Sequence, residues 1–169
     1  MRRIVFVLAS LAVVSIGAES RLSGQSGSNS ASLTVSATVT QNCTITTTPV
    51  NFGAYDPVSA NATAPLDGLG SVVVTCTRGA AAKVALSTGS NAEGTTRRMS
   101  QGAAAYLAYE LYKDPSRLTV WGDTLDTALD IPAAPSRIAR TYTVYGRVAA
   151  AQDATVGAYT DTVLATVNF

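Results

Sequence analysis

The residues best suited to chemistry in this sequence are its two cysteines, Cys43 and Cys76, which lie 33 positions apart. The spacing differs from the CxxC of a redox motif, and the sequence contains no histidine that could complete a zinc site with them. In an exported protein two thiols normally pair, because the compartment is oxidising. We therefore predict a structural disulfide, which at this loop length stabilises a fold by roughly 3–4 kcal/mol in the chain-entropy model.

Carboxylates are the other candidates for catalysis, and Asp123, Asp126 and Asp130 cluster in one segment. A carboxylate-based hydrolase needs two such groups at a defined separation, whereas a polar loop explains the cluster equally well. Without histidine there is no Ser–His or Cys–His pair, and no phosphate-binding or dinucleotide glycine pattern is present. We expect a protein that is not an enzyme and that holds no metal ion or cofactor.

The first 20 residues have the character of a signal peptide. Arg2 and Arg3 precede a mostly apolar run at 4–16, which is shorter than the roughly 20 residues of a membrane-spanning helix. Small residues at Ala18 and Ser20 favour cleavage before Arg21, with a second option after residue 17; a short membrane anchor is the alternative. Residues 21–30 are polar and rich in Gly and Ser, which predicts a flexible leader.

The charge balance argues against nucleic acid as a partner. The whole chain has 12 basic and 11 acidic residues, and removing Arg2, Arg3 and Glu19 with residues 1–20 leaves 10 of each. A net charge of zero offers no excess of cations to neutralise phosphates.

The remaining sequence reads as one domain of short β-strands, residues 31–169. The clearest strand lies at 30–40, where hydroxyl residues alternate with an apolar set that points to one side: Ala31, Leu33, Val35, Ala37 and Val39. Further strands are expected at 43–48, 70–77, 83–88, 105–112, 117–121, 141–148 and 157–169. Many short strands between turn residues predict a β-sandwich or barrel.

Local breakers and one tryptophan complete this interpretation. Pro49 is expected to end the strand at 43–48. Pro132 and Pro135 make the segment 125–140 a loop with at most one turn of helix. Trp121 is expected to be a core anchor, and the tyrosines of two strands to cover a half-buried sheet rather than to form a sugar-binding platform.

Six motifs in this order resemble the spore coat protein U domain family, which includes subunits of Csu-type, or archaic, chaperone–usher pili. They are ATVTQNCTI (37–45), NFGAYDP (51–57), GSVVVTCT (70–77), VALSTGSN (84–91), LAYELYKDPSRLTVWGD (107–123) and YTVYGRVAAAQDATVGAYTDTVLATVNF (142–169). The resemblance implies an immunoglobulin-like sandwich that lacks its last strand and is completed by a donor strand.

The resemblance also implies partners and a mechanism. A periplasmic chaperone fills the subunit's groove first, and at an outer-membrane usher the N-terminal strand of the next subunit replaces it. The partners are then copies of this chain or related pilins, and the product is a cell-surface fimbrium with a role in adhesion or biofilm formation. Residues 31–39 are the expected donor strand, and the sequence ends at Phe169 within its last expected strand.

On this basis the groove edge that meets the chaperone comprises Tyr159, Val163, Val167 and Phe169. The disulfide is expected to join the first strand of the domain to a neighbouring strand. Two alternatives stay open: a spore coat or cell-surface structural protein assembled without a chaperone, and an adhesin that binds a surface.

Overall fold

The computed structural model describes residue 24 and residues 26–102 and 104–169. The chain divides into two units, 1–37 and 38–169, and each is treated by itself. The expected signal peptide and most of the expected leader lie outside the described residues. Among the residues that are described, no helix is long and apolar enough to cross a membrane.

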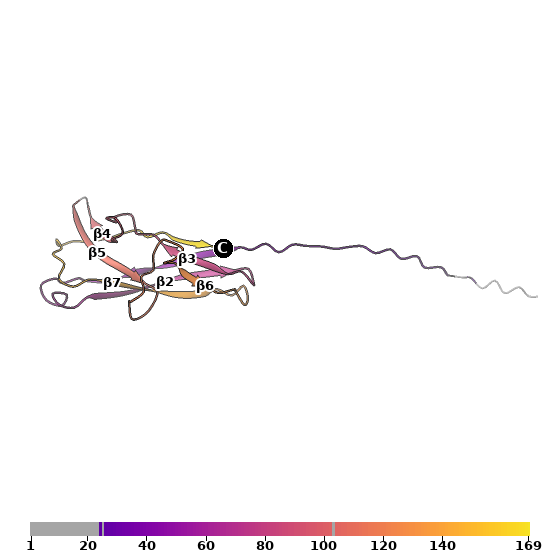
Figure 1. Cartoon of the computed structure of the whole chain (residues 1–169), viewed down its shortest axis with the longest axis horizontal. Coiled ribbons are helices and arrows are strands. Elements are labelled where there is room, and N and C mark those ends of the chain that lie inside the picture. The colour runs from indigo at the N-terminus through magenta and orange to yellow at the C-terminus, as the bar shows by residue number, and fades with distance from the viewer. Residues whose placement is uncertain (1–23, 25, 103) are drawn as a thin grey trace, which may run out of the picture. The chain divides into compact units, whose positions relative to one another are not determined.

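The second unit is an antiparallel β-sandwich (Figure 1). One sheet has the strand order β1-β2-β7-β5-β4 and the other the order β6-β3-β8. The strands are β1 (Cys43–Asn51), β2 (Leu66–Cys76), β3 (Ala82–Leu86), β4 (Arg98–Gln101), β5 (Ala105–Tyr112), β6 (Leu129–Ile131), β7 (Arg140–Val148) and β8 (Ala165–Asn168). The predicted all-β, immunoglobulin-like sandwich is confirmed.

Alternation of apolar residues along the strands builds the core between the sheets. Val72 and Val74 of β2 and Val144 of β7 meet Val84 and Leu86 of β3, and each is at most 4 % exposed. Period-two sequences bury one face of each strand, and burying a Val or Leu side chain contributes about 1.5–3 kcal/mol.

The predicted disulfide is confirmed and joins β1 to β2. Cys43 and Cys76 are directly opposite each other in the antiparallel pair, with a Cα–Cα distance of 4.1 Å. Both are buried in the core. The bond therefore fastens the edge strand of the larger sheet to its neighbour at the end where the domain begins.

Pro49 does not end the first strand, contrary to the expectation from sequence. β1 continues to Asn51, and its register with β2 shifts between Thr48 and Asn51. Because β1 is an edge strand, a proline within it costs no ladder bond on the solvent side.

Past this irregularity, Val50 and Phe52 cover three glycines of the central strands. A Cβ on Gly68 or Gly146 would lie 2.8 or 2.7 Å from the Phe52 ring, and one on Gly70 only 2.6 Å from a Val50 methyl group. The glycines are required here because any side chain would occupy the space that Val50 and Phe52 fill.

Two other predicted elements are wrong. Residues 117–121 form no strand and make only a bridge between Val120 and Tyr112. The segment 125–140 is not a loop throughout: it begins with a single turn, in which the Ala128 N–H donates to the Thr124 carbonyl at 2.8 Å, and then contains the strand β6. Trp121 is the expected core anchor: it is 0 % exposed, and its Nε1 donates a hydrogen bond of 2.7 Å to the Val84 carbonyl.

A small pH dependence should come from the outer face of the larger sheet. Arg147 donates bonds of 2.7 and 2.9 Å to both carboxylate oxygens of Asp67, and this hydrogen bonding holds the Asp67 pKa below its usual 3.8. A depressed pKa stabilises the fold above pH 4, and the contribution is lost as the pH falls through the lowered pKa. Since Asp67 is 38 % exposed, the loss should be below about 1 kcal/mol. Urea denaturation at pH 7 and pH 3 measures it, and Asp67→Asn should remove that part of the pH dependence.

Candidate functional site

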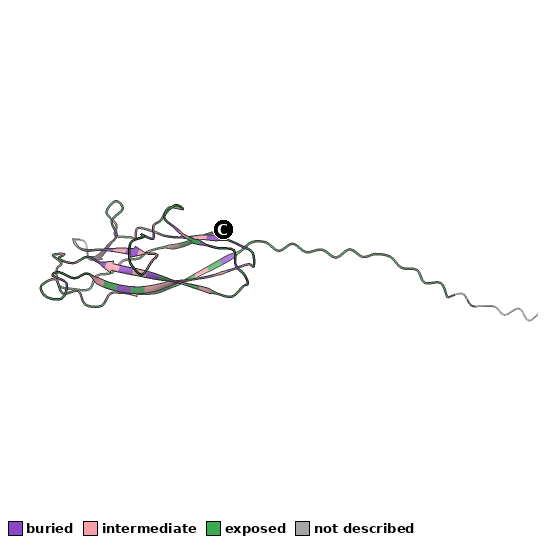
Figure 2. Cartoon of the chain, turned by 60° about the horizontal axis from the view of Figure 1, so that its bottom comes forward, coloured by how far each residue is buried: buried purple, intermediate pink, exposed green. Residues whose placement is uncertain are grey.

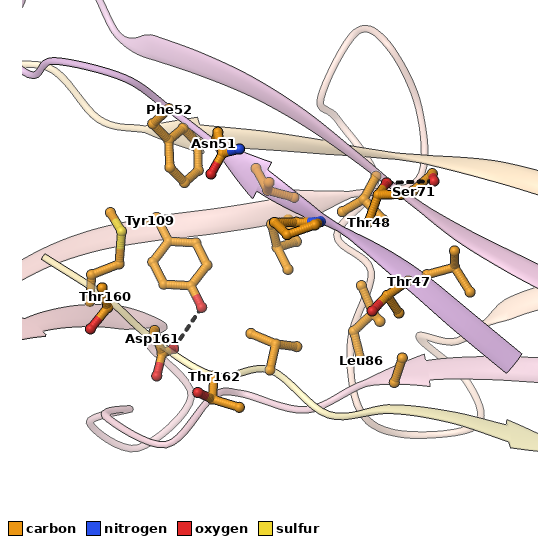
Figure 3. Close-up of a pocket in the computed structure, with 18 of the residues that line it drawn as sticks. Thr47, Thr48, Asn51, Phe52, Ser71, Leu86, Tyr109, Thr160, Asp161 and Thr162 are labelled. Carbon is orange, nitrogen blue, oxygen red and sulfur yellow. Dashed lines mark hydrogen bonds between the residues drawn. The ribbon is translucent and has the colours of Figure 1, made fainter.

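A groove runs between the edge of the larger sheet and the segment 154–165. It comprises two adjoining cavities of about 400 and 800 Å³, which share Val50, Phe52, Met99 and Tyr159 among their walls. Figure 3 shows the first cavity, with β1 on one side and Thr160, Asp161 and Thr162 on the other.

The floor of the first cavity is apolar. Val72, Leu86, Leu111 and Val144 line it, and these side chains belong to the core of the sandwich. Each of them is at most 4 % exposed, so the groove ends on the packed core.

The C-terminal wall of the groove is an extended segment that is bonded on one side. Thr160 exchanges backbone hydrogen bonds with Ser100, while Thr162 and Leu164 accept bonds from Ser90 and Ser87. Every second residue of the segment faces this side, and the next two, Thr166 and Asn168, lie opposite Ala85 and Lys83 of β3.

The alternate residues of this segment direct their backbone N–H and C=O groups away from β3 and toward the groove, because successive residues of an extended chain face opposite neighbours. These are Asp161, Val163, Ala165 and Val167. No strand of the described part of the chain pairs with this edge. The groove is therefore bordered by a row of free N–H and C=O groups, which is a template for another strand.

The opposite wall is β1, which pairs with β2 alone among the described strands. Thr47, Thr48, Pro49 and Asn51 face the groove from this side. Proline removes one N–H donor from this edge, so the C-terminal wall is the better partner for an added strand.

The groove also contains a hydrogen-bonded polar pair, Tyr109 and Asp161. The Tyr109 hydroxyl donates a 2.6 Å bond to Asp161 Oδ2, drawn in Figure 3. Asp161 Oδ1 accepts bonds from the backbone N–H groups of Ser90 and Asn91 and from the Asn91 side chain, at 3.0, 3.2 and 2.9 Å. Burial, together with the adjacent carboxylate, raises the pKa of Tyr109 above its usual value. This hydroxyl therefore stays protonated and remains a hydrogen-bond donor.

The four residues predicted for the groove edge do not all lie in the groove. Tyr159 and Val163 line it. Val167 lies in β8 opposite Val84 and packs against the core. Phe169 follows β8 and is 55 % exposed.

No strand of the described residues pairs with the expected donor segment. Residues 26–42 form no strand, although the sequence predicts one at 30–40. An isolated strand cannot satisfy its backbone or bury its apolar face. Leu33, Val35 and Val39 are 88, 86 and 82 % exposed, and Ala31 and Ala37 are exposed too. Figure 2 shows the segment before β1 in the colour of exposed residues.

The last predicted strand is also shorter than expected, since only Ala165–Asn168 of the segment 157–169 is a strand. Side chains replace part of the missing ladder: Ser87 Oγ accepts a 2.9 Å bond from the Leu164 N–H. Sequence reasoning missed Tyr109, Val50 and Phe52 as groove residues. Each stands in an apolar pattern that is equally typical of a closed core, so no signal separated them.

The described residues contain no group of three or more His, Cys, Asp or Glu side chains placed to hold a metal ion. Of the aspartates considered for catalysis, Asp130 forms an exposed ion pair with Lys83 at 2.8 Å. The three aspartates lie outside the groove.

Comparison with known proteins places the chain in a family. Residues 29–166 match the Spore Coat Protein U domain. Protein U of Myxococcus xanthus is 40 % identical over 129 residues, which cover 71 % of each chain.

The fold is also similar to that of a chain in the crystal structure of the CsuC–CsuE chaperone–tip adhesion subunit pre-assembly complex from archaic chaperone–usher Csu pili of Acinetobacter baumannii. The TM-score is 0.55 at 24 % identity, over 78 % of this chain and 40 % of that one. At this identity the likeness shows the fold, and this chain spans less than half of the other. The family match and the Myxococcus relative together establish that the chain belongs to the Spore Coat Protein U domain family.

Proposed function

We propose that this protein is a structural subunit of an extracellular pilus, assembled by donor-strand exchange through a chaperone–usher pathway. The observation that carries the proposal is the pairing of two features in one chain. The domain has an apolar groove with a free backbone edge, and the segment 31–39 presents an exposed alternating apolar face. The segment supplies the strand that the groove lacks, and the groove supplies the backbone partner and apolar surface that the segment lacks.

The physical basis is addition of a β-strand. A strand laid along 159–167 gains backbone hydrogen bonds, while alternate side chains enter the groove. Burying Leu33, Val35 and Val39, which are now more than 80 % exposed, contributes about 1.5–3 kcal/mol for each side chain. The sum offsets the entropy lost on ordering the segment and on association.

The same features account for the partners and the route. An open apolar groove beside a free sheet edge is an aggregation hazard, so a subunit in transit needs a chaperone strand to cover it. Exchange at an outer-membrane usher then replaces that strand by residues 31–39 of the next copy. The structural likeness to a chain of a chaperone–subunit complex supports this assignment, and the product is a cell-surface fimbrium.

We propose a structural rather than a catalytic role, which the family and fold support. The family's description favours one alternative, a coat protein that assembles without a chaperone. Such a protein would leave the groove empty or fill it within a single copy.

A peptide corresponding to residues 30–41 tests the proposal. Added in excess to the full-length chain, it should occupy the groove, stop the growth of SDS-resistant oligomers and raise the unfolding temperature. A ligand at 100 times its Kd stabilises by about 2.7 kcal/mol, which corresponds to several degrees for a domain of this size. A peptide of the same composition with its alternation scrambled is the control. Equal effects of both peptides, or of neither, would count against donor-strand exchange.

A further inference from the structure

This inference rests on the proposed function and concerns how the inserted strand finds its register. Apolar residues alternate from Ala31 to Val39 with a period of two. A slip by two residues would still direct the same face into the groove, so alternation alone specifies the register weakly. Some feature of the groove has to distinguish one position from the next.

The Tyr109–Asp161 pair is such a feature, because it is a polar group beside an apolar floor. Asp161 belongs to the wall formed by 159–167, with Tyr159 and Val163 on either side along the same face. Its carboxylate is fixed in place by Tyr109 from β5 and by Ser90 and Asn91 from the turn after β3. Oδ2 also lies against Gly89, where a Cβ would come within 2.0 Å of it, and the carboxylate as a whole is only partly buried.

The neighbour of Asp161 on an inserted strand would have its Cβ roughly 4.5–5.5 Å away and point into the same groove. A Leu or Val at that position would strip water from the carboxylate without replacing its hydrogen bonds, which is unfavourable. An alanine leaves room for a water molecule beside the carboxylate, and a serine keeps the small size while adding a hydroxyl that bonds to such a water. We propose that Asp161 is the specificity-determining residue of the groove and sets the register by accepting Ala37 of the incoming strand.

The length of the two segments favours Ala37 over Ala31. We take the inserted strand as antiparallel to the wall, since antiparallel pairing is the more stable per residue. In this orientation, placing Ala37 beside Asp161 aligns the whole of 31–39 with 159–167. Leu33 then lies beside Ala165, where a large side chain meets a small one, and Val35 beside Val163. Placing Ala31 beside Asp161 instead would leave Val163, Ala165 and Val167 without an apolar partner from 31–39.

The test compares Ala37→Leu with Ala31→Leu in the full-length chain, measuring SDS-resistant oligomers formed over time. Both positions are exposed and outside any strand, so neither change should affect folding of the domain. Ala37→Leu should slow assembly at least tenfold, whereas Ala31→Leu, the matched control, and Ala37→Ser should stay within about twofold of the original chain. Equal effects of the two leucine substitutions would overturn the register.

A second variant tests whether Asp161 is responsible. Asp161→Asn keeps the size of the side chain and one acceptor oxygen but removes the charge, so it should restore most of the assembly that Ala37→Leu loses. Thermal unfolding of Asp161→Asn alone shows that the domain is intact. If Ala37→Leu assembles equally poorly with and without the Asp161→Asn substitution, the side chain at 161 does not select the incoming residue.

Disulfide cross-linking between copies measures directly which residues of the two strands lie side by side. Leu33→Cys combined with Ala165→Cys should give a disulfide between copies, while Val35→Cys combined with Ala165→Cys, displaced by one repeat, should not. The native cysteines are bonded to each other and buried. The reverse cross-linking pattern would overturn the register but leave donor-strand exchange standing. Normal assembly after Leu33→Asp and Val35→Asp would instead contradict the proposed function itself.

Discussion

Replacing Leu33 and Val35 together by aspartate should give a subunit that folds normally and no longer assembles. Both side chains are more than 85 % exposed in the single chain, so the folded domain loses no contact. In the assembled fibre they would enter the groove, where each charge costs several kcal/mol without a partner. Assembly should fall at least a thousandfold, since each 1.4 kcal/mol is a factor of ten.

The measurement needs a matched control, because charge alone can keep proteins apart. Thr34→Asp with Ser36→Asp adds the same two charges to the same segment, on the face that stays outside the groove. Unheated gel electrophoresis and electron microscopy should show fibres for this pair and only monomers for the first. Thermal unfolding should be unchanged in both. Equal loss of assembly in the two pairs would mean that net charge, rather than insertion, controls the process.

The sequence was most informative where one face of a strand is buried. Apolar and β-branched patterns located β2, β3, β5 and β7 to within a few residues, and the strand predicted at 43–48 starts where β1 starts. The same pattern picked out 31–39, whose apolar face is exposed in the single chain. A period of two reports that a face must be buried, without telling whether the partner is in the same chain.

The groove itself was harder to predict, because its walls depend on contacts between distant residues. The segment 159–164 is held by Ser87, Ser90 and Ser100 rather than by a regular ladder, and hydroxyl residues carry no strand signal of that kind. In the sequence, Asp161 is a single polar residue in an alternating set with Tyr159, Val163, Ala165 and Val167. Its partners lie up to 71 positions away, so their convergence follows from the packing of the sheets.

Pro49 shows how topology overrides a local rule. Proline is a strand breaker in a central position, where its missing N–H leaves a neighbour unpaired. β1 is at the edge of its sheet, and only one side of it is paired. The position of a strand within its sheet is set by the whole fold, which a local pattern cannot supply.

Deleting residues 167–169 should remove half of the closing strand β8 and with it the ability of the domain to accept a donor. The deletion eliminates the pairs Val84–Val167 and Lys83–Asn168, exposes part of the core at Val84, and shortens the free edge beside the groove. We expect a lower unfolding temperature and no further rise on addition of the 30–41 peptide. A truncated chain that still responds fully to the peptide would show that the donor strand does not use the β8 edge.

A variant at Phe169 tests whether the incoming strand is held by the backbone edge alone or also by the side chain at 169. It follows β8 and is about half exposed, so Phe169→Ala should leave the unfolding temperature of the free subunit nearly unchanged. If Phe169 anchors an incoming strand, as we propose from the resemblance to chaperone–usher subunits, the same variant should weaken the response to the peptide. A full response would restrict the edge to Tyr159, Val163 and Val167. Either result leaves the free backbone edge as the feature that attracts the strand, since backbone pairing is independent of the side chain at 169.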